Sequence, residues 1–308
     1  MFVYFCKRIL GMIPVLLVII TVTFFLMRFA PGGPFSSEKK LSAEIKKNLE
    51  KKYHMDKPLV VQYFYYLGMI LQGDLGPSMK YENKTVVGII KEKFAVSLRI
   101  GFMAMFIALL LGTTIGFFAA LNQNSFIDYT CMSFAILGIS VPNLVLGPIL
   151  AVTFGLWLGW LPVAGWGELK HYILPVITLS CYYIAIIARI ARGSMLEVIR
   201  QDYIKTARSK GLSDWTIITR HAMKGALLPI VSYVGPASAF IITGSIVVEQ
   251  IFGIPGVGRE FVMGAIDRDY TMVMGTVILV SILVMTFNLF VDIAYGFIDP
   301  RIKLHEEK

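Results

Sequence analysis

Residues of the types that carry catalysis or bind metals are few in this chain, and their spacing suits neither task. The four histidines share no spacing typical of metal ligands; they are His54, His171, His221 and His305. The three cysteines, Cys6, Cys131 and Cys181, lie far apart, and none belongs to a Cys-x-x-Cys pair. The hydrolase motifs His-Glu-x-x-His and Gly-x-Ser-x-Gly are both missing. We therefore expect neither a metal site nor a catalytic centre.

Nucleotide hydrolysis would need a loop that cradles phosphates, and the sequence contains no Gly-x-x-x-x-Gly-Lys-Ser/Thr. The segment from Gly253 to Gly258 is rich in glycine, but it lacks the lysine and follows a long apolar run. We interpret it as a turn. The chain is expected to bind no cofactor and to hydrolyse no ATP itself.

One polar, basic segment lies between two long apolar runs. It reads Lys205-Thr-Ala-Arg-Ser-Lys-Gly211 and continues to Arg220. Gly211 suits the left-handed position that ends a helix, and Ser213 suits the cap that begins the next one. We predict two short helices hinged at Gly211 and joined directly to membrane spans. Such an element adds little to the stability of a lipid-embedded bundle, but it gives a soluble partner a rigid element to move.

The composition indicates lipid as the solvent. Of 308 residues, 56% are hydrophobic and only 16% are charged, more apolar surface than a soluble domain of this size could bury. The net charge of +9 could suggest nucleic acid. In a membrane protein, however, excess lysine and arginine marks cytoplasmic flanks and contact with anionic lipid. We expect membrane lipid as a partner and no nucleic acid.

Six apolar stretches reach the length of about 20 residues that a membrane-spanning helix needs. They are Ile9–Phe29, Leu98–Leu121, Cys131–Trp157, Tyr172–Ile190, Leu227–Ile251 and Met272–Phe297. The first is too long for a signal peptide, and Pro31-Gly-Gly-Pro34 is typical of a helix stop rather than a cleavage site. The predicted fold is an all-α polytopic membrane protein with six transmembrane helices.

The distribution of basic residues predicts the orientation. Lys7 and Arg8 place the N-terminus in the cytoplasm, and the basic loop 191–226 and the tail 301–308 follow on the same side. Residues 1–29 then form the N-terminus and first span, 30–96 an extracytoplasmic region, and 97–300 a five-helix core. The outer region holds eleven lysines, although lysine and arginine usually gather in cytoplasmic loops. Loops beyond about 60 residues, however, translocate largely regardless of charge.

The outer region is expected to be helical. Leu41, Ile45, Leu49 and Tyr53 recur every four residues, as on an exposed helix that rests one stripe on a neighbour. Leu59–Gly73 is apolar but too short to cross the membrane. Since its tyrosines suit the headgroup level, we predict an interfacial or packed helix there.

The centres of the six spans contain no charged residue. Arg28, Arg99, Arg189, Glu249 and Asp292 lie toward span ends, from which a long side chain can reach the interface. Ion- and proton-coupled carriers accept the cost of charges at the midplane, about 2.5–3.5 kcal/mol each. The pattern argues against such a carrier and against a charge-selective channel.

Uncharged polar residues within the spans have two interpretations, helix–helix hydrogen bonding or a neutral lining for a large polar solute. The possible lining residues are Ser140, Asn143, Ser238, Thr243 and Asn288. Gly112-Thr-Thr-Ile-Gly116 predicts close helix packing. Pro142, Pro148 and Pro236 predict kinks.

Several motifs occur together in one order along the chain. They include Met27-Arg-Phe-Ala-Pro-Gly-Gly-Pro34, Gln72-Gly-Asp-Leu-Gly76, Val141-Pro-Asn143, Arg192-Gly-Ser-Met-Leu-Glu197, Asp202-Tyr-Ile-Lys-Thr-Ala-Arg-Ser-Lys-Gly211, Pro255-Gly-Val-Gly258 and Asp299-Pro-Arg301. Through them the chain resembles, over nearly its full length, the ABC importer permeases of the oligopeptide and dipeptide family, in particular the oligopeptide permease B-type subunit.

The resemblance implies a type I ABC importer permease fold with an extracytoplasmic helical insertion after the first helix. It also implies a second permease subunit, two ATPase subunits that use ATP and Mg²⁺, and an extracytoplasmic peptide-binding protein. The residues that would couple to the ATPase are Tyr203, Lys205, Ala207, Arg208, Gly211, Leu212, Arg220, Leu228 and Pro229. Other importer permeases carry an acidic residue at the position of Lys205, whereas members of the peptide branch usually carry a basic one.

The function expected from this resemblance is a permease subunit that moves oligopeptides across the bacterial cytoplasmic membrane. Two alternatives stay open. A permease of the same family could carry nickel, haem or another small solute. Only the ligand bound by the extracytoplasmic binding protein would distinguish that case from peptide transport. A standalone six-span carrier or channel would lack ATPase subunits.

Overall fold

The computed structural model describes residues 2–30, 33, 51, 53–243 and 246–298, with side chains from residue 7 to residue 294. Apart from one isolated bridge between Pro77 and Thr85, every regular element in these ranges is helical. The predicted helix through Leu41, Ile45 and Leu49, most of the Pro31–Pro34 stop and the tail 301–308 lie outside the described residues.

The chain folds as two compact units, and each is assembled from segments distant in sequence. The first comprises Met1–Val96 and Gly256–Met285, and the second comprises Ser97–Pro255 and Thr286–Lys308. Two long helices, α4 (Val86–Leu121) and α13 (Tyr270–Ile298), contribute residues to both.

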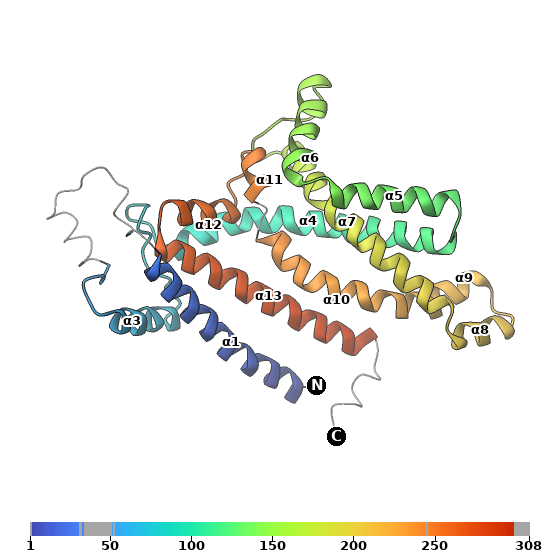
Figure 1. Cartoon of the computed structure of the whole chain (residues 1–308), viewed down its shortest axis with the longest axis horizontal. Helices are drawn as coiled ribbons and strands as arrows, with labels where there is room; N and C mark the ends of the chain where they lie inside the picture. Colours follow the sequence, from blue (N-terminus) through green and yellow to red (C-terminus); the bar gives the residue numbers. More distant parts are fainter. Residues whose placement is uncertain (1, 31–32, 34–50, 52, 244–245, 299–308) are drawn as a thin grey trace. The chain divides into compact units, whose positions relative to one another are not determined.

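In the first unit, the apolar helix α3 (Leu59–Leu71) packs against α1 (Phe2–Phe29; Figure 1). Phe24 of α1 and Tyr66 of α3 are both buried in one hydrophobic cluster with Met274 and Ile278 of α13. The Tyr63 and Thr21 hydroxyls lie 2.6 Å apart and hydrogen bond. The sequence predicts an interfacial or a packed helix over Leu59–Gly73, and the packing is confirmed.

A polar network in the first unit fixes the segment before α4. The buried Asp269 carboxylate accepts hydrogen bonds from the Ser78 hydroxyl, from the backbone N–H groups of Met79 and Lys80, and from the N–H of Met272 at the start of α13. The segment around residue 78 is thereby tied to the turn between α12 (Val257–Ile266) and α13.

The second unit is organised around α7 (Lys170–Ile199), which packs against α5 (Phe126–Ser140), α6 (Asn143–Leu150) and α10 (Met223–Ile242; Figure 1). Helix α4 approaches α7 through Gly112 and Gly116. A Cβ atom built on Gly112 would lie 2.8 Å from Cβ of Ile187, closer than side chains pack. The close packing predicted from the Gly-x-x-x-Gly motif is confirmed.

The third predicted span is not one continuous helix. Helices α5 and α6 meet at 103°, because Pro142 has no N–H to donate and holds Val141 in extended backbone. The kink predicted at Pro142 is thus a full break. After Pro148, α6 continues as the π-helix η1 (Ala151–Trp157).

Within the described residues, five helices are long and apolar enough to cross a membrane, and the bent pair of α5 and α6 makes six if it counts as one span. The fifth predicted span, Leu227–Ile251, comprises α10 and a short helix, α11 (Ile246–Ile251). Glu249 of α11, which the sequence places toward a span end, has its side chain inside the protein. It is 4% exposed and accepts a 2.7 Å hydrogen bond from the Ser97 hydroxyl.

Candidate functional site

The polar segment forms the loop that the sequence predicts. Helix α8 (Asp202–Ser209) follows α7 after a short turn, and Gly211 ends it with a φ of +76°. The Ser213 hydroxyl then accepts a hydrogen bond from the Thr216 N–H and caps α9 (Asp214–Thr216). The hinge at Gly211 is confirmed. The second short helix is joined directly to the next span, as predicted, since α9 runs through the π-helix η2 (Ile217–Ala222) into α10 (Figure 1).

One face of α8 is buried within the chain. Ile204 and Ala207, three residues apart and therefore on the same helix face, are both buried, and α8 packs against η2. Tyr203 lies close to α10, because a Cβ atom on Gly225 would be 3.4 Å from its hydroxyl. These contacts hold α8 against η2 and α10, the helices that follow the loop.

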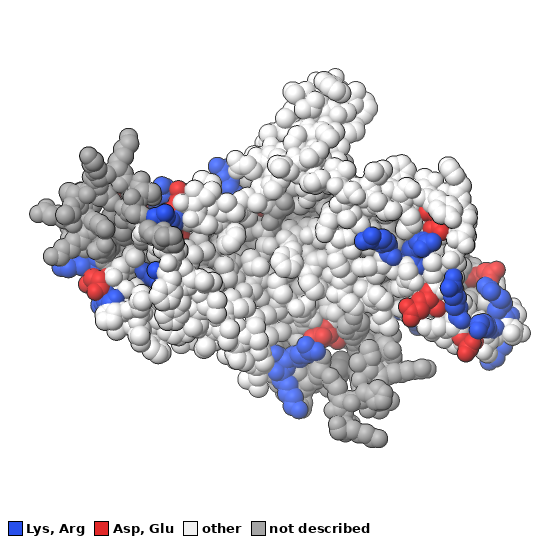
Figure 2. Space-filling model, viewed as in Figure 1, with Lys and Arg blue, Asp and Glu red and all other residues white. Residues whose placement is uncertain are grey.

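The other face of the loop is exposed and mixes apolar with charged groups. Tyr203, Leu212 and Trp215 are exposed, and Trp215 keeps 75% of its surface accessible. Exposed ion pairs join Lys205 to Asp202 at 2.9 Å and Arg208 to Asp214 at 3.3 Å. Figure 2 shows charged side chains gathered at this end of the unit. Exposed apolar side chains with charged neighbours are typical of a protein-binding surface.

The hydrogen bond from the Lys205 ammonium lowers the pKa of the Asp202 carboxyl below its ordinary value. An aspartate carboxyl is already ionised at neutral pH, and the lowered pKa keeps this one ionised further into acid. Lys205 and Asp202 together present a paired charge on α8 rather than a lone cation.

The nine residues predicted for ATPase coupling fall into two groups. Six lie on α8 or in the turn after it, and Ala207 alone among them turns its side chain inward. Arg220 is exposed on η2, whereas Leu228 and Pro229 lie within α10. Trp215 was missed by the sequence analysis. Its position two residues after the Ser213 cap, in a charged loop, was the available signal.

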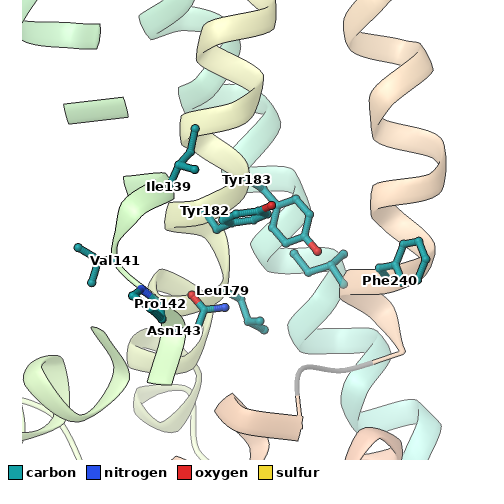
Figure 3. Close-up of a pocket in the computed structure, with 9 residues that line it drawn as sticks. Ile139, Val141, Pro142, Asn143, Leu179, Tyr182, Tyr183 and Phe240 are labelled. Atoms are coloured by element: carbon teal, nitrogen blue, oxygen red, sulfur yellow. The ribbon is translucent and has the colours of Figure 1, made fainter. Parts of the chain in front are cut away.

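A cavity of about 420 Å³ lies in the second unit, at the break between α5 and α6. Its lining is uncharged and consists of Ile139, Val141, Pro142, Asn143, Leu179, Tyr182, Tyr183, Phe240 and Ile241. Figure 3 shows the rings of Tyr182 and Tyr183 extending from α7, with Phe240 facing them from α10 and Asn143 at the start of α6. Two phenols and one amide supply the hydrogen-bonding groups of a largely apolar pocket.

Of the five predicted lining residues, Asn143 lines this cavity. Ser238 and Thr243 are buried in and just after α10, and the Thr243 hydroxyl donates to the Ala239 carbonyl. The Ser140 hydroxyl donates to the Ile136 carbonyl, and Asn288 is exposed on α13. Tyr182, Tyr183 and Phe240 were missed, although two adjacent tyrosines within a predicted span were a signal for a polar site.

Across the described part of the chain, no three His, Cys, Asp or Glu side chains gather closely enough to hold a metal ion.

Known proteins resemble this chain along its whole length. The family model of the binding-protein-dependent transport system inner membrane component matches residues 112–304, and the model of its N-terminal part matches residues 1–100. The oligopeptide transport system permease protein OppB of Haemophilus influenzae is 50% identical over 299 residues, or 96% of this chain and 98% of the relative. The dipeptide transport system permease protein DppB of Bacillus subtilis is 44% identical over 304 residues, 99% of each chain.

A solved structure agrees in fold. A chain of the inward-facing MetNI methionine ABC transporter aligns with a TM-score of 0.56 and 16% identity, over 68% of this chain and 96% of that chain. The all-α, polytopic type I permease fold is thereby confirmed, as is the resemblance to oligopeptide and dipeptide permeases. The chain belongs to the family of inner membrane components of binding-protein-dependent transport systems.

Proposed function

We propose that this chain is a permease subunit of an ATP-driven importer that moves oligopeptides into the cell and forms the pathway together with a second permease subunit. The observation that carries the proposal is the full-length similarity to the oligopeptide permease of Haemophilus influenzae. The helical loop at Gly211 supports it, because a rigid loop with an exposed apolar face suits a soluble partner that must move membrane helices.

The exposed face of the loop is the proposed docking surface for one of two ATPase subunits. Tyr203, Leu212 and Trp215 would enter a groove on that subunit, and Lys205 and Arg208 would make peripheral contacts. ATP and Mg²⁺ would be used by those subunits alone. Closure of the ATPase pair would move α8, and its packing on η2 would pass this displacement to α7 and α10.

In this proposal both termini and the Gly211 loop face the cytoplasm of a bacterial cell, and residues 30–96 face outward. An extracytoplasmic peptide-binding protein would deliver the solute to the outer side. The neutral cavity suits such a solute, because a peptide presents many donors and acceptors together with arbitrary side chains. Charged groups that bound these strongly would retain the peptide, whereas phenols and an amide bind weakly.

The test is reconstitution of the complete importer in liposomes, followed by ATP-dependent uptake of a labelled peptide of two to five residues in the presence of the binding protein. Uptake that requires ATP and this chain is the expected result. Nickel or haem uptake without peptide uptake would reassign the solute, and uptake by this chain alone would replace the importer with a standalone carrier.

A further inference from the structure

An ion pair joins α5 to α7 in the second unit, where no predicted function required one. Nε of Arg192 lies 2.6 Å from Oδ1 of Asp128, and Nη2 lies 2.7 Å from Oδ2. The two parallel contacts fix both the distance and the orientation of the guanidinium and carboxylate groups. Asp128 is only 1% exposed.

The carboxylate of Asp128 also organises the turn between α4 and α5. It accepts a 2.9 Å hydrogen bond from the N–H of Asn124, whose φ is +61°. The Ser125 hydroxyl accepts from the N–H of Asp128 and caps α5. One buried side chain therefore fixes the α4–α5 turn, the first turn of α5 and α7 to one another.

Stability alone gives little reason for a buried ion pair here. Burying a carboxylate such as Asp128 costs several kcal/mol, even though Arg192 keeps 27% of its side chain exposed, and apolar residues of similar volume often stabilise a protein as well or better. Unlike apolar packing, the ion pair fixes a defined geometry between the two helices α5 and α7.

The two helices that the ion pair joins lead to the two candidate functional features, α7 to the Gly211 loop and α5 to the cavity. Arg192 is about two helical turns before the end of α7, after which the chain enters α8. In the same part of α7, the Ser194 hydroxyl donates a 2.8 Å hydrogen bond to the Ala226 carbonyl of α10. From Asp128, helix α5 runs to Ser140, about 18 Å away at the usual rise per residue, and it ends beside the cavity residues Ile139 and Val141.

We propose that the Asp128–Arg192 pair transmits displacement of α8 to α5, so that movement of the Gly211 loop shifts the α5–α6 break and changes the cavity. Both are positioning residues, since neither lines the cavity and neither lies on the exposed face of α8. This inference rests on the proposed function, because it assigns the pair a place in the coupling of ATP hydrolysis to transport.

The test uses the complete importer in liposomes and measures peptide uptake and ATP hydrolysis in the same samples. Asp128→Asn keeps the size of the side chain and one of its two acceptor oxygens but removes the charge, and Arg192→Lys keeps the charge but cannot form both parallel contacts. Each is expected to raise the ATP consumed per peptide imported by about tenfold, a loss on the scale of interaction energies between contacting residues. The double variant should be no worse than either single one.

The matched control is Gln123→Ala. Gln123 accepts an exposed 3.3 Å hydrogen bond from Arg200, so it joins the same α4–α5 turn to the end of α7 without a buried charge. Its ratio of ATP to peptide should stay at the wild-type value, and ATP-dependent uptake by the wild type verifies the proposed function independently.

Two results would overturn the inference. In one, the variants keep the wild-type ratio, or lose uptake and hydrolysis in equal proportion. In the other, even the conservative Arg192→Lys variant fails to assemble with its partners, which would make the pair a requirement for folding rather than for transmission.

Discussion

Gly116 of α4 faces the carbonyl oxygen of Ala188 on α7 so closely that even a methyl group would overlap it. The two helices are therefore in backbone contact at this point. No flexible side chain is available to move aside, because the nearest atoms are backbone and the Cβ of Ala191.

Gly116→Ala should consequently separate α4 from α7 and destabilise the subunit by about 1–3 kcal/mol, the usual cost of overpacking. Gly193→Ala is the control, since it lies on α7 with no atom within 4 Å of an added Cβ. Thermal stability of the purified subunit in detergent measures both. Equal stability of the two variants would mean that the close contact is dispensable.

Gly211→Val should impair ATPase binding and peptide uptake while membrane insertion stays normal. No neighbour lies within 4 Å of an added Cβ, so the defect would come from the φ of +76°, which a β-branched residue resists. Gly211→Asn is the matched variant, because asparagine tolerates this conformation. Co-purification of ATPase subunits should be recovered with asparagine, and a defect of equal size in both variants would contradict the backbone explanation.

Trp215→Ala should weaken association with the ATPase subunits by about 2 kcal/mol, as expected for an aromatic side chain that becomes buried at an interface. The dissociation constant of the detergent-solubilised complex measures this. Trp157→Ala serves as the comparison, since Trp157 at the end of η1 is 79% exposed but lies outside the loop. Unchanged ATPase affinity in Trp215→Ala would remove Trp215 from the docking surface.

The predicted orientation can be tested with single cysteines in a chain freed of its native ones. An impermeant thiol reagent added outside the cell should label Lys84→Cys and leave Lys210→Cys unmodified, and both positions are exposed. Labelling of Lys210→Cys and not of Lys84→Cys would mean that the orientation is the reverse of the predicted one.

Local signals predicted local structure well. Gly211 and Ser213 were identified as a hinge and a cap because each acts through its own backbone or the next turn. The break at Pro142 was underestimated, because a proline predicts disruption but not an angle of 103°.

The candidate lining was harder to predict, because lining depends on how each helix is rotated about its axis. Thr243 and Asn143 are equally plausible lining residues in the sequence. In the structure, the Thr243 hydroxyl hydrogen bonds to its own helix, whereas the Asn143 side chain borders the cavity. Glu249 lies toward a span end in the sequence, and nothing in its neighbourhood indicates that packing against Ser97 buries it. Such partners, 152 residues apart, leave no signature in a local pattern.

The Asp269 carboxylate imposes an order of events on biosynthesis. It accepts from the N–H groups of Met79 and Lys80, which precede it by 190 and 189 residues. The segment around residue 78 is synthesised early, but its hydrogen-bond acceptor emerges only with the last membrane helix. That segment must therefore stay without its final partner while the intervening helices insert, and contacts so distant in sequence form slowly. A chain truncated before Asp269 would lack the carboxylate that accepts from both N–H groups, and the first unit could not complete this network until Asp269 has been synthesised.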